Sequence, residues 1–249
     1  GGTGGFDSLS IVGGTYQTVV LTASGPDAGT IDLDGQRITY AGLEPISVNG
    51  SVDTNYVVNG TAGDDALIVD LDGGNIRVSG ATIESVTFTS APTGSLTING
   101  GDGTDSVTVA DNLSLPGADL AINAEIITVN SGVTISTFDG VASYGDIVFT
   151  ASASETITTL LDPTAEPTAQ ISVTDASIEG GTISMIASAA TMVTVAETDI
   201  VSEITFALAI ARPSARVSID GASSITSHTD GNSSGDVSFS AVANVTGSV

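Results

Sequence analysis

The chain has 249 residues, of which 41% are hydrophobic, and its 29 acidic residues face only four arginines and no lysine, so the net charge is −25. Neutralising phosphates requires clustered Arg and Lys, so this charge excludes direct electrostatic binding to nucleic acid or to an anionic membrane surface. The absence of cysteine excludes disulfides and thiolate metal sites and leaves oxygen as the metal donor. Cations are the expected counter-charge.

No stretch of the chain is apolar enough to span a membrane. The richest stretch, residues 204–210, is far shorter than the roughly 18 apolar residues that a transmembrane helix needs. The sequence starts with Gly-Gly-Thr-Gly, without Met and without a charged-then-apolar leader. We therefore expect a fragment of a longer chain with no membrane span.

Short β-type runs separated by Gly, Asn, Asp, Ser and Pro follow one another along the chain. They recur every 8 to 12 residues or so, which is typical of an all-β protein. The segment 202–212 carries β-branched Ile204, Thr205 and Ile210 among its alanines and is expected to be a strand, whereas 162–168 is expected to be a protruding loop. The other expected runs are 8–12, 18–22, 30–33, 37–40, 46–48, 56–58, 66–70, 75–78, 85–89, 95–98, 106–109, 119–129, 131–137, 145–151, 181–187, 215–221 and 235–241.

Self-comparison shows a degenerate repeat. The block 100–109, Gly-Gly-Asp-Gly-Thr-Asp-Ser-Val-Thr-Val, is matched by the blocks 60–69 and 2–11. Their turn aspartates are Asp7, Asp65 and Asp105, which lie 58 and 40 residues apart. These separations are close to three and two units of about 20 residues, a length found in repeat architectures. The repeat predicts a solenoid with about 20 residues per coil.

Three stretches, 123–137, 145–151 and 38–46, carry a resemblance to a known class of proteins. They resemble the very large bacterial surface proteins built from β-strand repeats, the adhesin or filamentous-haemagglutinin-like class. The resemblance implies a right-handed parallel β-helix in an exported protein, located at the cell surface or outside the cell. No linker strong enough to divide the chain is visible, so we expect a single β-solenoid domain over residues 1–249, with RTX-like Gly/Asp turns in 1–111 and haemagglutinin-like coils in 112–249.

The Gly/Asp turns are the candidate metal site. Residues 100–108 fit the nonapeptide Gly-Gly-x-Gly-x-Asp-x-apolar-x, which holds calcium between the turns of calcium-binding β-rolls. The candidate Ca²⁺ ligands are Asp7, Asp64, Asp65, Asp102 and Asp105. In β-rolls the ligands come from repeats nine residues apart, whereas here the copies are 40 and 58 residues apart. The alternative is that each turn Asp caps backbone amides.

No catalysis is expected. A polysaccharide lyase or hydrolase on this scaffold needs paired carboxylates, or a carboxylate with a cationic side chain, in one groove. Arg37 and Arg77 are the only arginines among the acid-rich turns. His228 lies in a polar stretch without another His or Cys, and we expect it to be an exposed turn residue.

The sequence thus predicts a structural rod or adhesive segment of a large exported bacterial surface protein. Its expected partners are a surface polysaccharide, a host or an abiotic surface. Neighbouring coils of the same long chain, or a second copy in end-to-end self-association, are also expected because the ends of a solenoid are open. The alternatives are a carbohydrate-active β-helix enzyme and a calcium-dependent binding module.

Overall fold

The computed structural model describes residues 7–43, 45–49, 54–157, 164–194, 210–229 and 235–248. Every helix or strand assigned in these ranges is a strand, which confirms the all-β class expected from the sequence. Across the same ranges we find no helix with the length and hydrophobicity needed to cross a bilayer. Most of the expected strand 202–212 lies outside the described residues.

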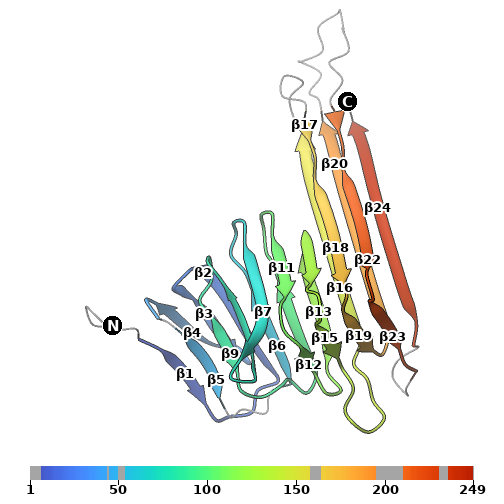
Figure 1. The fold of residues 1–249 in the computed structure, drawn as a ribbon. Helices are drawn as coiled ribbons and strands as arrows, with labels where there is room; N and C mark the ends of the chain where they lie inside the picture. Colours follow the sequence, from blue (N-terminus) through green and yellow to red (C-terminus); the bar gives the residue numbers. More distant parts are fainter. Residues whose placement is uncertain are drawn as a thin grey trace, which may run out of the picture.

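The described strands form two sheets of nine strands each, one sheet of four strands and one sheet of two strands (Figure 1). Sheet A contains, in spatial order, β1 (Leu9–Val12), β5 (Ile46–Asn49), β9 (Val86–Phe88), β8 (Asn75–Gly80), β7 (Ala66–Asp72), β11 (Ser106–Val109), β14 (Ile126–Val129), β18 (Thr168–Thr174) and β22 (Ser214–Asp220). Sheet B contains β24 (Val237–Ser248), β20 (Ile183–Thr194), β16 (Ile147–Ile157), β13 (Asp119–Ala124), β10 (Ser95–Asn99), β6 (Asn55–Asn59), β2 (Thr18–Gly25), β3 (Ala28–Leu33) and β4 (Gln36–Ala41). Sheet C contains β12 (Leu113–Ser114), β15 (Thr134–Ser136), β19 (Ser177–Gly180) and β23 (Ser224–Ser227).

Most strand pairs are parallel, and the exceptions are local hairpins. The antiparallel pairs join β2 to β3, β3 to β4, β7 to β8 and β8 to β9. From β10 onward the three sheets are visited in a fixed order, sheet B, then sheet A, then sheet C, four times before the chain returns to sheet B in β24. The first strand of sheet C, β12, begins at Leu113, close to residue 112, where the haemagglutinin-like coils are expected to begin.

The core is built from rows of apolar side chains that are in register across neighbouring strands. Alternate residues of a strand point to the same face, so an apolar residue at every second position buries one face of each sheet. In sheet A, Val107 pairs with Leu67 on one side and with Ile127 on the other, and each is at most 1% exposed. Tyr56 and Phe88 stack within the same core with their ring centroids 4.2 Å apart.

The spacing between hydrogen-bonded neighbours differs from the expected 20 residues. Asp105 and Glu125 are 20 residues apart, but side-chain or backbone partners across other strand pairs are separated by 24, 27, 36, 40 and 54 residues. Two features account for the longer steps. Along the chain, hairpin strands such as β8 and β9 come between β7 and β11, although β7 and β11 are neighbours in sheet A. The later strands are also longer.

Strand length changes abruptly along sheet B. β10 and β13 have 5 and 6 residues, whereas β16, β20 and β24 have 11, 12 and 12. Pairing between β13 and β16 ends at Ala124 and Ala151, so the rest of β16 extends past its shorter neighbour. Figure 1 shows these long strands rising above the shorter ones.

The protruding loop expected at 162–168 is only partly described. Residues 158–163 lie outside the described ranges. Thr164–Ala165 is not loop but the short strand β17, which pairs in parallel with β21 (Ile210–Ala211). This pairing places β17 beside the extended end of β16, with which it makes contact.

Candidate functional site

Two Gly/Asp turns stack directly on each other at the corner between sheets B and A. Residues 60–65 link β6 to β7, and residues 100–105 link β10 to β11. The register pairs Leu67 with Val107, which confirms the alignment of the two sequence blocks. The 40 residues between them therefore form a single step between neighbouring strands of sheet A.

Glycines allow the backbones of these turns to touch. A Cβ on Gly101 would lie 2.2 Å from the carbonyl oxygen of Thr61, and one on Gly103 would lie 2.8 Å from the carbonyl carbon of Gly63. Both Gly101 and Gly103 have positive φ, 124° and 123°, a region that L side chains rarely adopt. The second and third glycines of the motif thus serve close packing of one turn on the next.

A ladder of carboxylates runs through this corner. The Asp65 backbone N–H donates to Oδ1 of Asp105 over 2.8 Å, and the Asp105 N–H donates to Oε2 of Glu125 over 2.7 Å. Asp65 in turn accepts a bond of 2.6 Å from the Thr61 N–H on Oδ2, and Asp64 accepts one of 2.8 Å from the Thr104 N–H. Each of these carboxylates therefore accepts a hydrogen bond from a backbone amide, as the capping alternative predicts.

Within the ladder, the negative charge of Asp105 is the least well stabilised. Its residue is 1% exposed, and its Oδ2 atom is buried without a hydrogen-bond partner. The pKa of Asp105 rises from 3.8 to about 6, first because of burial and then because Glu125, Asp65 and Asp64 are negatively charged. The hydrogen bond from the Asp65 amide acts in the opposite direction.

An asparagine ladder precedes the same corner. The Asn99 amide donates to Oδ1 of Asn59 and the Asn123 amide donates to Oδ1 of Asn99, both over 2.8 Å. Asn59 also donates to the hydroxyl of Thr22 over 3.0 Å. The three asparagines are partly buried and Thr22 is exposed. Together they link four neighbouring strands of sheet B, so both sides of the corner are held by side-chain hydrogen bonds along the sheet.

A groove of about 600 Å³ lies beside the 100–105 turn, next to the part of β16 that extends past β13. Its walls are the turn from Gly101 to Thr104, the corner at Glu125 and Ile126, the end of β16 and the start of β18. The ionisable residues that line it are all acidic: Asp102, Glu125, Glu155 and Glu166. The groove is therefore suited to cationic or hydrogen-bond-donating groups.

The structure brings together four of the five aspartates predicted as ligands. Asp64 and Asp65 lie in one turn, Asp102 and Asp105 in the turn stacked on it. Asp7 precedes β1 at the edge of sheet A, with β5, β9 and β8 between β1 and β7. Asp7 therefore does not belong to this corner. Within the described ranges, no group of three or more His, Asp or Glu side chains is arranged to hold a metal ion.

Glu125 is the residue of the corner that the sequence reasoning missed. Glu125 follows β13 directly and is the single residue between β13 and β14, whereas six residues link β6 to β7 and six link β10 to β11. Its signal was present, because Glu125 lies 20 residues after Asp105, the coil length inferred from the repeat. The Gly motif that marks the other two turns does not precede Glu125, so the motif does not identify it.

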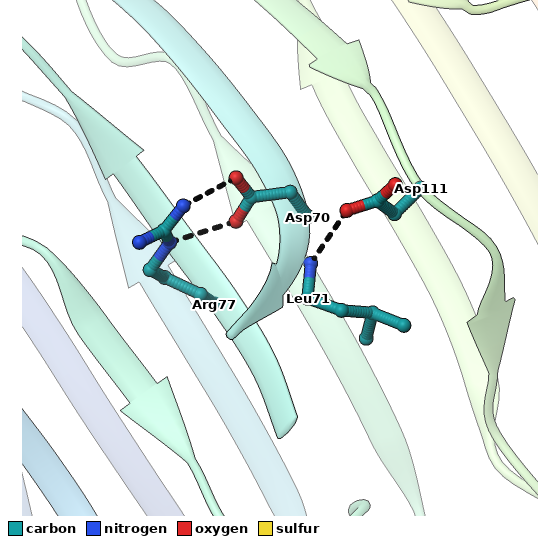
Figure 2. Close-up of polar contacts among 4 residues, drawn as sticks. All are labelled: Asp70, Leu71, Arg77 and Asp111. Carbon is teal, nitrogen blue, oxygen red and sulfur yellow. Dashed lines mark hydrogen bonds and ion pairs between the residues drawn. The ribbon is translucent and has the colours of Figure 1, made fainter. Parts of the chain in front are cut away.

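Arg77 is committed to a nearby carboxylate. Its Nε and Nη2 atoms donate to the two oxygens of Asp70 over 2.8 and 2.6 Å, and the Leu71 N–H donates to Asp111 over 3.2 Å (Figure 2). The hydrogen bonds to Asp70, together with the charges of Asp70, Asp72 and Asp111, raise the pKa of Arg77. Neither Arg77 nor Arg37 lines the acidic groove.

His228 is partly buried and is not the exposed turn residue expected from the sequence. Its ring stacks on Tyr144 with centroids 4.2 Å apart, and Tyr144 stacks on Phe138 at 4.8 Å. The Nε2 atom of His228 lies 3.0 Å from Oε1 of Glu179. This cluster joins the loop after β15 to β19 and to the end of β23. Burial and the nearby charge of Glu179 raise the pKa of Tyr144.

Replacing Gly101 by Ala tests the contact between the turns. Gly132 is the matched control, because it also has positive φ, 82°, but nothing lies within 4 Å of an added Cβ. Gly132→Ala should cost about 1 kcal/mol of unfolding free energy through backbone strain. Gly101→Ala adds a collision with the Thr61 carbonyl and should cost about 3 kcal/mol. Urea unfolding followed by circular dichroism measures both, and equal losses would contradict the close stacking.

Replacing Asp105 by Asn should stabilise the chain at high pH. The folded pKa of Asp105, about 6, lies above the unfolded value of 3.8, so the protonated form is favoured by folding and stability falls as pH rises through about 6. Asp105→Asn should gain up to about 3 kcal/mol above that pH, at about 1.4 kcal/mol per pKa unit. The gain should vanish below pH 3.8, where the carboxyl is protonated in both states.

Unfolding in urea with chelator present, across this pH range, measures the effect. Asp102→Asn, at an exposed carboxylate of the same turn, is the control and should change stability little. A destabilised Asp105→Asn protein at every pH would show that the buried charge is not a cost to folding.

Comparison with known proteins leaves the geometry of this corner as the basis for any functional assignment. No protein-family model, no curated protein and no solved structure matches the chain.

Proposed function

We propose that the chain is a segment of a right-handed parallel β-helix and serves as a structural rod or adhesive segment of a large exported bacterial surface protein. The observation that carries the proposal is the cyclic order of the strands. From β10 to β24 the chain passes through sheets B, A and C in turn, and each strand pairs in parallel with the strand one cycle earlier. A chain that winds around an axis, one turn per cycle, produces this order.

The side-chain ladders support the same architecture. In-register stacking of identical polar residues satisfies the amide groups of one strand by those of the next, and it recurs in structures that repeat along one direction. The ladder of Asn59, Asn99 and Asn123 follows this pattern across three parallel strands. Such contacts hold each turn of the chain mainly to its neighbours, which suits an extended rod.

The surface chemistry supports an exported location and a polar partner. The outward row of sheet A carries hydroxyl side chains in register, from Thr108 to Thr128 and Ser172. With a net charge of −25, the chain suits a salt-containing exterior. Surface polysaccharides, or a host or abiotic surface, are the proposed contacts along the rod.

Antibody labelling of the source cells tests the location. Antibodies raised against the chain should label intact cells, and external protease should remove the label, because a surface rod is accessible from outside. A cytoplasmic protein of the same cells, labelled only after permeabilisation, is the control. Label that appears only after permeabilisation would contradict the proposed surface location.

Calcium binding at the stacked turns is a second candidate function. It is supported by the buried Oδ2 of Asp105, which has no hydrogen-bond partner, and by the carbonyls of Thr61 and Gly100 at the contact between the turns. Calcium takes about six to eight oxygen ligands, including backbone carbonyls and water. Since the described carboxylates form no three-ligand group, carbonyls and water would supply much of the shell.

Thermal unfolding with calcium or with chelator tests this candidate. At a hundredfold excess of calcium over its Kd, stability should rise by about 2.7 kcal/mol. Asp105→Asn should abolish the rise, whereas Asp7→Asn, distant in sheet A, should retain it. An unchanged melting temperature in the unmodified chain would dispose of calcium binding and leave the proposed rod untouched.

Carbohydrate cleavage remains an alternative. An arginine in a groove beside two carboxylates would favour it. Arg77 is paired with Asp70, and neither Arg77 nor Arg37 lines the acidic groove. The absence of catalysis stays a prediction.

A further inference from the structure

β16 has a free backbone edge in the middle of sheet B. Its pairing with β13 ends where Ala124 lies opposite Ala151, but β16 continues to Ile157 and stays paired with β20 over that whole length (Figure 1). Among the described strands, none pairs with the other side of this extension, since β17, which contacts β16, is hydrogen-bonded to β21. Strands precede and follow β16 in sheet B, so the free edge results from the difference in strand length alone.

Alternate residues of the extension direct their backbone groups to the open side. In a parallel strand the N–H and C=O of one residue face the same neighbour, and those of the next residue face the opposite one. The Ile147 N–H donates to the Thr182 carbonyl, directly before β20. By this alternation the N–H and C=O groups of Ser154 and Thr156 face away from β20. They offer a hydrogen-bonding ladder to an added strand.

The acidic groove lies along this edge. Ala153, Ser154 and Glu155 of the extension line it. Ala153 is only 7% exposed, and Glu155 follows two residues later, so both belong to the inward-facing row of the strand. A strand added to the edge would direct every second side chain to the same face of the sheet. Those side chains would enter the groove and meet its four carboxylates.

The apolar part of the groove suits long basic side chains. Ile126, Ala153 and Pro167 line it together with the carboxylates. Lysine and arginine pack their aliphatic stems along apolar surface while the charged end reaches a polar group. The groove therefore fits such side chains better than it fits a short or purely apolar one.

Charge disfavours a second copy of this chain at the edge. An inward-pointing charge is one means by which edge strands avoid pairing with another chain, and Glu155 provides it here. This chain has no lysine and only four arginines with which to neutralise the groove. One of them, Arg77, is already paired with Asp70. The complementary charge points to a different protein.

We infer that the extension of β16 and the acidic groove together bind an extended, basic segment of a partner protein. The segment adds to sheet B as a strand beside β16, in line with β13. Its backbone bonds to Ser154 and Thr156, and its lysine or arginine side chains pair with the groove carboxylates. Backbone pairing gives affinity in this mode of recognition, and alternate side chains give specificity. The site needs only the edge and the groove and does not rest on the proposed rod.

Fluorescence anisotropy of a labelled peptide, titrated with the full chain, tests the inference. The peptide alternates threonine and lysine, is blocked at both ends and matches the free edge in length. It should bind, whereas the same peptide with glutamate in place of lysine should not. The double substitution E155Q and E166Q should weaken binding at least tenfold, since it removes two charges from the groove. The double substitution D27N and D72N, at exposed carboxylates outside the groove, is the matched control and should leave binding unchanged.

N-methylated peptides separate backbone pairing from charge and need no variant of the chain. Methylating the lysine amides blocks one edge of the peptide strand, and methylating the threonine amides blocks the other, while the charge is unchanged. Only one edge can face β16, so one methylated peptide should bind like the unmodified peptide and the other at least tenfold more weakly. Equal affinities for the two methylated peptides, no binding of the lysine peptide, or equal losses for the two double substitutions would each overturn the inference.

Discussion

The hydrogen bond from the Asp65 amide to the buried carboxylate of Asp105, 2.8 Å long, fixes how the corner of the molecule is assembled. It can form only if β7 and β11 are adjacent and in register, with Leu67 opposite Val107. Three features follow from that register: the stacking of the glycine turns, the burial of Oδ2 of Asp105, and the hydrogen bond from the Asp105 N–H to Glu125. A slip of one residue would turn every core side chain of these strands outward.

Net charge and edge composition act on the molecule at different ranges. The acidic surface keeps copies apart over distances set by the salt concentration, while backbone pairing acts only on contact. A chain of this charge has little need of charged residues on each edge strand to stay soluble.

The sequence predicts the residues that form a single turn better than the number of residues from one turn to the next. The Gly/Asp alignment of 60–69 with 100–109 is confirmed because glycine and aspartate have strict backbone and hydrogen-bonding requirements in a tight turn. The 20-residue coil is not general, because the β8 and β9 hairpin strands contain the same alternation as the strands around them and nothing in that pattern marks them as insertions. Asp7 is predicted as a ligand because its block carries the same Gly/Asp pattern, and Glu125 escapes prediction because its one-residue corner needs no glycine. Alternation does not encode the crossovers between sheets, so it fixes neither the handedness of the chain path nor whether the sheets close around an axis.

The site arises where the regularity of the fold changes. Through β6 and β10 the corner is a six-residue turn, at Glu125 it is a single residue, and from β16 onward the strands extend past it. The shortened corner leaves space beside the Gly101–Thr104 turn, and the longer strands wall that space on the other side, which produces the acidic groove. Burying Asp105 beside it has an electrostatic cost that the backbone hydrogen bonds offset only in part. A proton relieves the remainder, which is why the pKa of Asp105 is raised and why the stability of the fold depends on pH at this position.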